Sequence, residues 1–251
     1  MSPIFHQAAA LSFLPWWLPA NVSAHGQSLD RHLILNLWLV LALLTLSHLL
    51  LLLGLLHRRT AESQNLWQIE YLPLAILALL FATLTVKAEH LWAASRYIGA
   101  DPAALQIEVT GVQFAWYFRY PGTDATFGIT KQQLIAPGEG NPIGIDPADP
   151  HSADDFVTSE LVLPVNREVD LRIRAQDVIH GFAIPEMRLK QNAVPGQTIH
   201  VHFTPTTSGT YAILCTQLCG LGHYRMNATV RVLTAAEFAQ WLATKQKAAQ
   251  P

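Results

Sequence analysis

The sequence has few charged residues and no excess of positive charge. Charged residues make up 14% of the 251 residues, and the formal net charge at pH 7 is −2. Proteins that bind DNA or RNA usually present a basic face, because lysine and arginine neutralise the phosphates. The charge balance therefore argues against nucleic acid as a partner.

Cysteine is equally scarce. The two cysteines, Cys215 and Cys219, are too few for a disulfide framework. The sequence contains no C-x-x-C-H motif, which excludes a c-type haem fused to these residues. It also has no internal repeat. What remains is enough chain for one sizeable domain, together with a strongly apolar region.

The apolar residues are concentrated between about residues 33 and 94. The run Leu33–Leu56 has no formal charge, and as a helix it would measure roughly 36 Å, enough to cross a lipid bilayer. A second run covers Leu66–Val86, and the basic segment His57–Arg59 lies between the two. Because basic loops stay on the cytoplasmic side, both termini are expected outside. The sequence thus predicts a transmembrane hairpin over residues 33–94, in a bacterial-type inner membrane.

The hairpin leaves two external parts, residues 1–32 and residues 95–251. In the first part a cleaved leader is the less favoured interpretation, because no basic residue precedes Arg31. The second part is expected on the periplasmic side. Its short β-type runs, separated by turn signals, predict a β-sandwich or Greek-key barrel. The candidate strands are Leu105–Thr110, Val112–Tyr120, Phe156–Val165, Val169–Ala175, Thr198–Phe203, Tyr211–Cys215 and Ala228–Leu233.

Two further features complete this domain. Pro137–Asp155 is rich in Gly, Pro and Asp and is predicted to form a long loop. Thr234 followed by Glu237 has the spacing of a capping box, which predicts a last helix. The apolar stripe of this helix, which includes Phe238 and Trp241, is expected to dock on the barrel or on a partner.

The segment Cys215–Met226, called here the cysteine loop, carries the most specific motif. It reads C-x3-C-x3-H-x2-M and includes Cys219 and His223, while His180 follows an earlier strand-like stretch. Thiolates, imidazoles and a thioether form a soft ligand set, which favours copper over magnesium or calcium. Structural zinc prefers C-x2-C spacing, and a single blue copper needs only one cysteine. The second thiolate would let both sulfurs bridge two copper ions.

These residues also allow other interpretations. Cys215 and Cys219 could form a disulfide in an oxidising compartment, but a His and a Met directly after the pair favour a metal. His200 and His202 fall on one face of a strand and are interpreted as surface or packing residues. His151 is expected to be solvated in the acidic loop.

Together with the cysteine loop, three segments resemble cytochrome c oxidase subunit II: Gly111–Trp116, Asp177–His180 and Lys190–Gly196. The resemblance implies a membrane α-helical hairpin plus an all-β cupredoxin-like Greek-key barrel. It implies a binuclear copper centre, CuA, whose two copper ions would be held by His180, Cys215, Cys219, His223, Met226 and the backbone carbonyl of Gln217.

The resemblance also implies partners and a role. The copper centre would accept electrons from cytochrome c and pass them to a haem in oxidase subunit I. That subunit, with the other oxidase subunits, would reduce dioxygen to water and translocate protons. This chain would be the electron-transfer subunit and would not bind oxygen.

The sequence departs from the family in three places. Many members have Glu where Gln217 stands, and an amide is a poorer ligand for a hard cation, which argues against the family's Mg site. The tryptophan through which electrons enter the family's centre aligns with Phe114. The next aromatic is Trp116, which we favour because it is an indole. The family's proton-accepting Glu aligns with Leu66, and Glu62 or Glu70 could replace it.

Two further expectations concern other functions and donor docking. A membrane-anchored copper chaperone for oxidase assembly is the alternative from another class, but His180 before the cysteines and Met226 after them argue against it. The quinol-oxidase form of the subunit lacks the copper ligands, which are all present here. A cluster of acidic residues is expected to dock a cationic cytochrome c, namely Asp146, Asp149, Asp154, Asp155 and Asp177.

Overall fold

The computed structural model describes residues 18–57 and 67–249, which form two compact units. One unit is Gln27–Tyr97, and the other combines the segment up to Gly26 with the chain from Ile98 onward. Residues 1–17, which include most of the less favoured leader, lie outside the described residues, as do the basic loop with Arg58 and Arg59, Glu62 and Leu66. Their predicted roles are therefore not examined by the structure.

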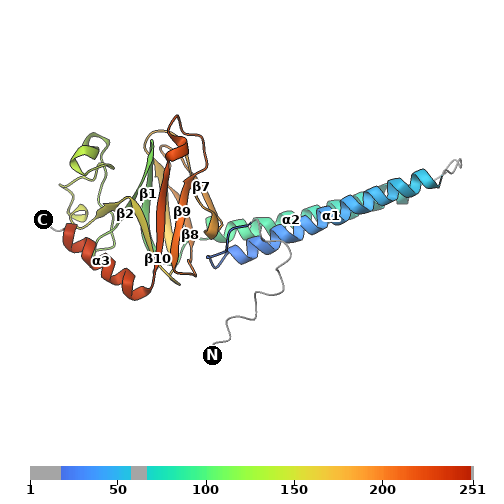
Figure 1. Cartoon of the computed structure of the whole chain (residues 1–251), viewed down its shortest axis with the longest axis horizontal. Helices are drawn as coiled ribbons and strands as arrows, with labels where there is room; N and C mark the ends of the chain where they lie inside the picture. Colours follow the sequence, from blue (N-terminus) through green and yellow to red (C-terminus); the bar gives the residue numbers. More distant parts are fainter. Residues whose placement is uncertain (1–17, 58–66, 250–251) are drawn as a thin grey trace, which may run out of the picture. The chain divides into compact units, whose positions relative to one another are not determined.

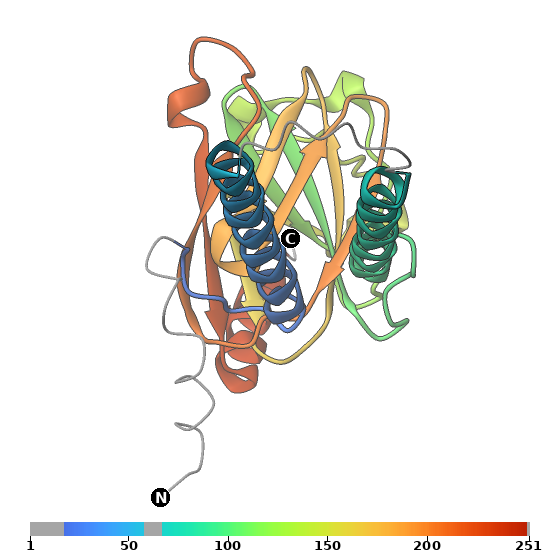
Figure 2. The same cartoon turned by 90° about the vertical axis from the view of Figure 1, so that its right-hand side faces the viewer.

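The helical unit consists of α1 (Gly26–Leu56) and α2 (Trp67–Arg96), drawn in blue and teal in Figures 1 and 2. Both are long and apolar enough to cross a membrane, α1 over its full length and α2 over Glu70–Ala94. α1 begins at Gly26 rather than Leu33, and α2 continues past Val86, because a helix keeps its backbone hydrogen bonds beyond the apolar run. Glu70 lies in the first turn of α2.

The other unit is a β-sandwich of two five-stranded sheets (Figure 1). The first sheet has the order β3-β2-β1-β5-β8, and the second has the order β4-β10-β9-β6-β7. Their bounds are β1 Leu105–Val112, β2 Ala115–Tyr120, β3 Phe156–Thr158, β4 Glu160–Pro164, β5 Val169–Ala175, β6 His180–Ile184, β7 Leu189–Ala193, β8 Ile199–Phe203, β9 Gly209–Cys215 and β10 Asn227–Leu233.

The core lies between the sheets and draws on the strands of both. Ile107 and Phe118 from the first sheet and Leu163, Phe182 and Val230 from the second are fully buried in one cluster. Burying such side chains contributes about 2 kcal/mol each, which makes this interface the main source of stability. Two apolar helices followed by this all-β domain confirm the predicted fold class.

Two strand predictions differ from the structure in detail. The run Phe156–Val165 was predicted as one strand, but it divides at Ser159 into β3 and β4, which belong to different sheets. The run Val112–Tyr120 is interrupted by Gln113 and Phe114, which form the turn between β1 and β2. This turn lies at the same end of the sandwich as the end of β5, because β1 and β5 are parallel and pair Gly111 with Ala175.

The last helix and the N-terminal segment both pack against the sandwich. α3 (Ala235–Ala249) begins with the predicted capping box, in which the Glu237 N–H donates to Thr234 Oγ1. Its Trp241 ring lies 5.1 Å from that of Tyr120, which confirms docking on the β domain. Before α1, Val22 is buried, and its N–H donates to the carbonyl of Glu186. Part of the predicted N-terminal segment is therefore integral to the β unit.

Candidate metal centre

The candidate ligands come together at one end of the second sheet. His180 is the first residue of β6, Cys215 is the last residue of β9, and Met226 directly precedes β10. β6, β9 and β10 are antiparallel neighbours, so these three positions lie at the same end of the sheet. The cysteine loop covers this end, which is opposite to the end of the domain where α3 begins (Figure 1).

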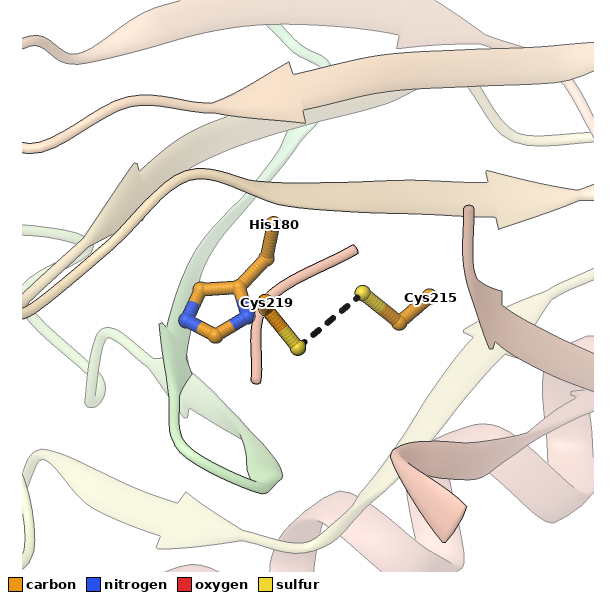
Figure 3. A group of neighbouring side chains, drawn as sticks. All are labelled: His180, Cys215 and Cys219. Carbon is orange, nitrogen blue, oxygen red and sulfur yellow. Dashed lines mark hydrogen bonds between the residues drawn. The ribbon is translucent and has the colours of Figure 1, made fainter. Parts of the chain in front are cut away.

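The sulfur and nitrogen atoms of these residues converge on one point. The two cysteine Sγ atoms are 3.8 Å apart, and the ligand atoms of His180, Cys215 and Cys219 all lie within 4.8 Å of one another (Figure 3). Cys219 Sγ also lies 3.6 Å from His223 Nδ1 and 3.7 Å from Met226 Sδ. Among the residues that the structure describes, His180, Cys215 and Cys219 form the one group of His, Cys, Asp and Glu side chains arranged to hold a metal ion.

The backbone adds an oxygen to this group. Cys215 Sγ lies 3.2 Å from the carbonyl oxygen of Gln217, the atom that the family resemblance implies as a ligand. Both cysteines are free thiols, and their separation is far larger than the roughly 2.05 Å of a disulfide bond. The structure therefore presents a dithiol rather than a cross-link.

His180 is held in the orientation that a metal ligand requires. Its side chain is completely buried, and Nε2 lies 2.8 Å from Asp177 Oδ1. A carboxylate at that distance keeps the proton on Nε2, and Nδ1 then presents a lone pair. Nδ1 is buried without a hydrogen-bond partner. An unpaired buried nitrogen beside two thiols fits a soft metal, which would supply the missing interaction.

The ionisation of the site in the metal-free chain is set by burial and by hydrogen bonds. Burial, together with the neighbouring Cys215, raises the pKa of Cys219 to about 11. At neutral pH the metal-free thiol is therefore protonated, and a metal must displace that proton to bind. Burial alone would raise the pKa of Asp177. The hydrogen bonds from His180, Gln113 N–H and Val178 N–H outweigh it and hold the pKa below its usual value.

The two aromatic candidates for electron transfer lie at different depths. Trp116 is 1% exposed, and its ring makes edge contacts with His180 at 5.8 Å and Phe182 at 5.2 Å. Phe114 is half-buried in the β1–β2 turn and lies 5.7 Å from the guanidinium carbon of Arg225 in the cysteine loop. Phe114 is thus nearer the surface, and Trp116 lies behind His180.

The predicted acidic docking cluster is wrong for two of its members. Asp146 is buried and pairs with Lys131 at 2.6 Å, and Asp155 is buried in an ion pair with Arg119. Both carboxylates hold the long loop in place and are not available to a partner. The sequence could not reveal this, because neither basic partner is near in sequence to the carboxylate it meets.

Three further histidines of the β domain lie outside the candidate ligand group. His200 Nδ1 lies 2.9 Å from Asp170 on the first sheet, in agreement with the predicted surface or packing role. His202 lies between Glu168 and the Ile98 carbonyl, at 2.6 Å and 2.7 Å. His151 is exposed as predicted, but it is paired with Asp124 at 2.6 Å.

Comparison with known proteins extends this picture. Residues 105–233 match a family model described as cytochrome c oxidase subunit II, periplasmic domain. An alternative cytochrome c oxidase subunit 2 from Bradyrhizobium diazoefficiens is 36% identical over 149 residues, which cover 59% of this chain and 53% of that protein. A cytochrome c oxidase subunit 2 from Synechocystis is 33% identical over 150 residues, covering 60% and 35%. The matched region spans about half or less of these relatives.

Solved structures give a similar match. The periplasmic domain of subunit II of cytochrome oxidase from Bradyrhizobium japonicum is 29% identical and is covered to 99%, against 60% of this chain, with a TM-score of 0.44. A haem–copper terminal oxidase dimer includes a chain that is 17% identical with a TM-score of 0.41.

Proposed function

The chain belongs to the cytochrome c oxidase subunit II family, and from that premise we propose that it receives electrons for a membrane-bound haem–copper oxidase. Cytochrome c is the proposed donor, and a haem in subunit I is the proposed acceptor. Subunit I, with the other subunits, would then reduce dioxygen to water and translocate protons. The observation that carries the proposal is the convergence of two thiols, two imidazoles and a thioether at the end of the second sheet that the cysteine loop covers.

We assign a binuclear copper centre, CuA, to these residues. His180, Cys215, Cys219, His223 and Met226 would hold it, with the carbonyl of Gln217. Two bridged copper ions would supply a reversible one-electron carrier whose charge is shared, so that little geometry changes on reduction. The proposal includes no magnesium site, because Gln217 offers an amide where a hard cation prefers a carboxylate.

The protein residues would give this carrier its position and surroundings. Asp177 orients His180, and the buried side chains of Cys219 and Met226 keep water from the sulfurs. A dry, fixed ligand group needs little reorganisation when an electron arrives or leaves. These roles belong to the chain itself and do not depend on which cytochrome serves as donor.

We place the electron-accepting face on the cysteine loop. Leu218, Leu221 and Tyr224 are 78%, 99% and 85% exposed, and Phe114 lies beside Gly222 in the same loop. These exposed apolar side chains could contact the exposed edge of a donor haem. Asp146 and Asp155 could not contact a donor, because both are buried. Phe114 would form the outer contact, and Trp116 would support His180 from behind.

The membrane arrangement follows from the helices. α1 and α2 would cross the inner membrane as a hairpin, with both termini and the copper domain on the periplasmic side. The uncharged run Leu33–Leu56 within α1 supports this arrangement, and the basic segment after His57 favours a cytoplasmic connection.

Copper stoichiometry tests the proposal and separates it from a copper chaperone. The full chain, purified in detergent and loaded with copper under reducing conditions, should retain two copper ions per chain after gel filtration. The Cys219→Ser chain serves as the matched control and should retain fewer. A wild-type value of one copper per chain would favour the chaperone and contradict the proposal.

A further inference from the structure

Gln113, in the turn between β1 and β2, contacts two parts of the candidate metal site: Asp177, which meets His180, and the backbone of Cys219. It is exposed, and neither its amide nor its position marks it as a metal ligand. Its backbone N–H donates to Asp177 Oδ2 at 2.7 Å, and its side-chain Nε2 donates to the carbonyl of Cys219 at 2.5 Å. One residue thus joins segments that are far apart in sequence.

The first bond belongs to a chain that ends on His180. Asp177 accepts from Gln113 through Oδ2 and meets His180 Nε2 through Oδ1 at 2.8 Å. The parallel pairing of β1 with β5 brings these residues together, since Gly111 is opposite Ala175 and the Gln176 N–H donates to the Gly111 carbonyl. The carboxylate that orients the histidine is therefore itself fixed by the β1–β2 turn.

The second bond fixes the cysteine loop. Gly220, directly after Cys219, has a φ of +132°, and a Cβ there would lie 2.8 Å from Gln113 Nε2. A Cβ on Gly222 would lie 2.4 Å from Phe114 Cδ2. These glycines let the loop approach the turn closely enough for the amide to reach the Cys219 carbonyl.

We propose that Gln113 is a positioning residue that holds Cys219 and His180 at a fixed separation before any metal binds. The inference rests on the proposed function for its biological meaning, since a preorganised ligand group loses less entropy on metal binding and moves less on electron transfer. The hydrogen bonds themselves are a property of the metal-free chain. They can therefore be tested without copper.

The test compares Gln113→Leu with wild type in the full chain, purified in detergent, reduced and metal-free. Leucine keeps the size and the backbone N–H but cannot donate to the Cys219 carbonyl. Amide hydrogen exchange across residues 216–222 should become about 5-fold faster, the loss expected for one hydrogen bond. Gln106→Leu is the control, because Gln106 lies on β1, the strand that leads into the same turn, and accepts a hydrogen bond from Arg172 instead.

Copper adds a second readout that a general loss of stability would not produce. In Gln113→Leu, a chelator should remove copper about 10-fold faster, the usual cost of losing a residue that supports a ligand. The paramagnetic resonance spectrum should also show unequal hyperfine coupling to the two nuclei. If hydrogen exchange in the cysteine loop matches wild type while Gln106→Leu behaves identically, the positioning role is overturned. If instead wild type fails to bind two coppers but the exchange result holds, only the proposed function fails.

Discussion

Cys219 contacts three of the other candidate ligands, because its sulfur lies within 3.8 Å of Cys215 Sγ, His223 Nδ1 and Met226 Sδ. Cys219→Ser should abolish the shared-electron copper spectrum, because a hydroxyl cannot replace a soft bridging thiolate. His200→Ala should leave the spectrum unchanged, because His200 meets Asp170 on the other sheet. Loss of the spectrum in a folded His200→Ala chain would overturn the ligand assignment.

The pair His151–Asp124 provides a pH-dependent signal on the surface. The hydrogen bond to Asp124 raises the pKa of His151, and the same bond lowers the pKa of Asp124. The pair's contribution to stability is complete between the unfolded pKa values of aspartate and histidine, about 3.9 and 6.5, and is lost as pH rises through the raised folded pKa of His151. At the acid side it is lost as pH falls through the lowered pKa of Asp124.

Nuclear magnetic resonance titration of the His151 ring measures this shift. Asp124→Asn should move the midpoint down towards the ordinary value, whereas Asp101→Asn, a change at an exposed turn residue, should not move it. A His151 midpoint that is the same in wild type and Asp124→Asn would show that the ion pair does not form in solution.

The sequence was sufficient to select residues that converge at the candidate metal centre, but not the residues that support them. Two Cys, a His and a Met within one loop form a soft-metal ligand pattern, so the segment Cys215–Met226 could be selected from the sequence alone. Gln113 could not be selected, because its contacts depend on the parallel pairing of β1 with β5. Likewise, Asp146 and Asp155 looked solvated in a loop rich in Gly and Pro, and only their contacts with distant basic residues bury them.

At the scale of elements, the sequence predicted the strands with alternating or β-branched residues but did not predict β6 and β7, which are less regular. β6 reads HGFAI, is buried at every position and begins with the candidate ligand His180, so it gives no period-2 pattern. Its partner β7 reads LKQNA and contains polar residues that are poor strand formers. Cross-strand pairing with β9 and β6, rather than local propensity, makes these segments extended.

The long loop between β2 and β3 is held on the first sheet by a buried charge cluster. Arg119 on β2 is 2% exposed, pairs with Glu108 on β1 at 3.2 Å and with Asp155, and donates to the Gly128 carbonyl at 2.7 Å. Arg119→Met would leave Asp155 buried without its cation. The free energy of unfolding should fall by about 3 kcal/mol, measured by urea denaturation.

Arg167→Met is the matched control for this change. Arg167 is exposed and makes one long hydrogen bond to the Ala103 carbonyl, at 3.4 Å. Its loss should alter the free energy of unfolding by no more than about 0.5 kcal/mol. Equal stability of the two variants would show that the buried cluster contributes nothing to holding the loop.

At the scale of the whole molecule, the two apolar helices make the chain a membrane-anchored protein, and its orientation is a prediction. Single cysteines placed at Ser28, before the apolar run of α1, and at Lys247 in α3 should react with a membrane-impermeant maleimide in intact spheroplasts. The background would be a chain in which Cys215 and Cys219 are replaced by serine. A cysteine at His57 should react only after the membrane is permeabilised. Labelling of His57→Cys in intact spheroplasts would reverse the topology.

The central claim is that the cysteine loop and His180 hold two copper ions that share one unpaired electron. Electron paramagnetic resonance of the copper-loaded, oxidised full chain measures this most directly. The account predicts one unpaired spin per two copper ions, with equal hyperfine coupling to both nuclei. A spectrum of one isolated copper, with coupling to a single nucleus, or a stable disulfide between Cys215 and Cys219 in the native protein, would contradict it.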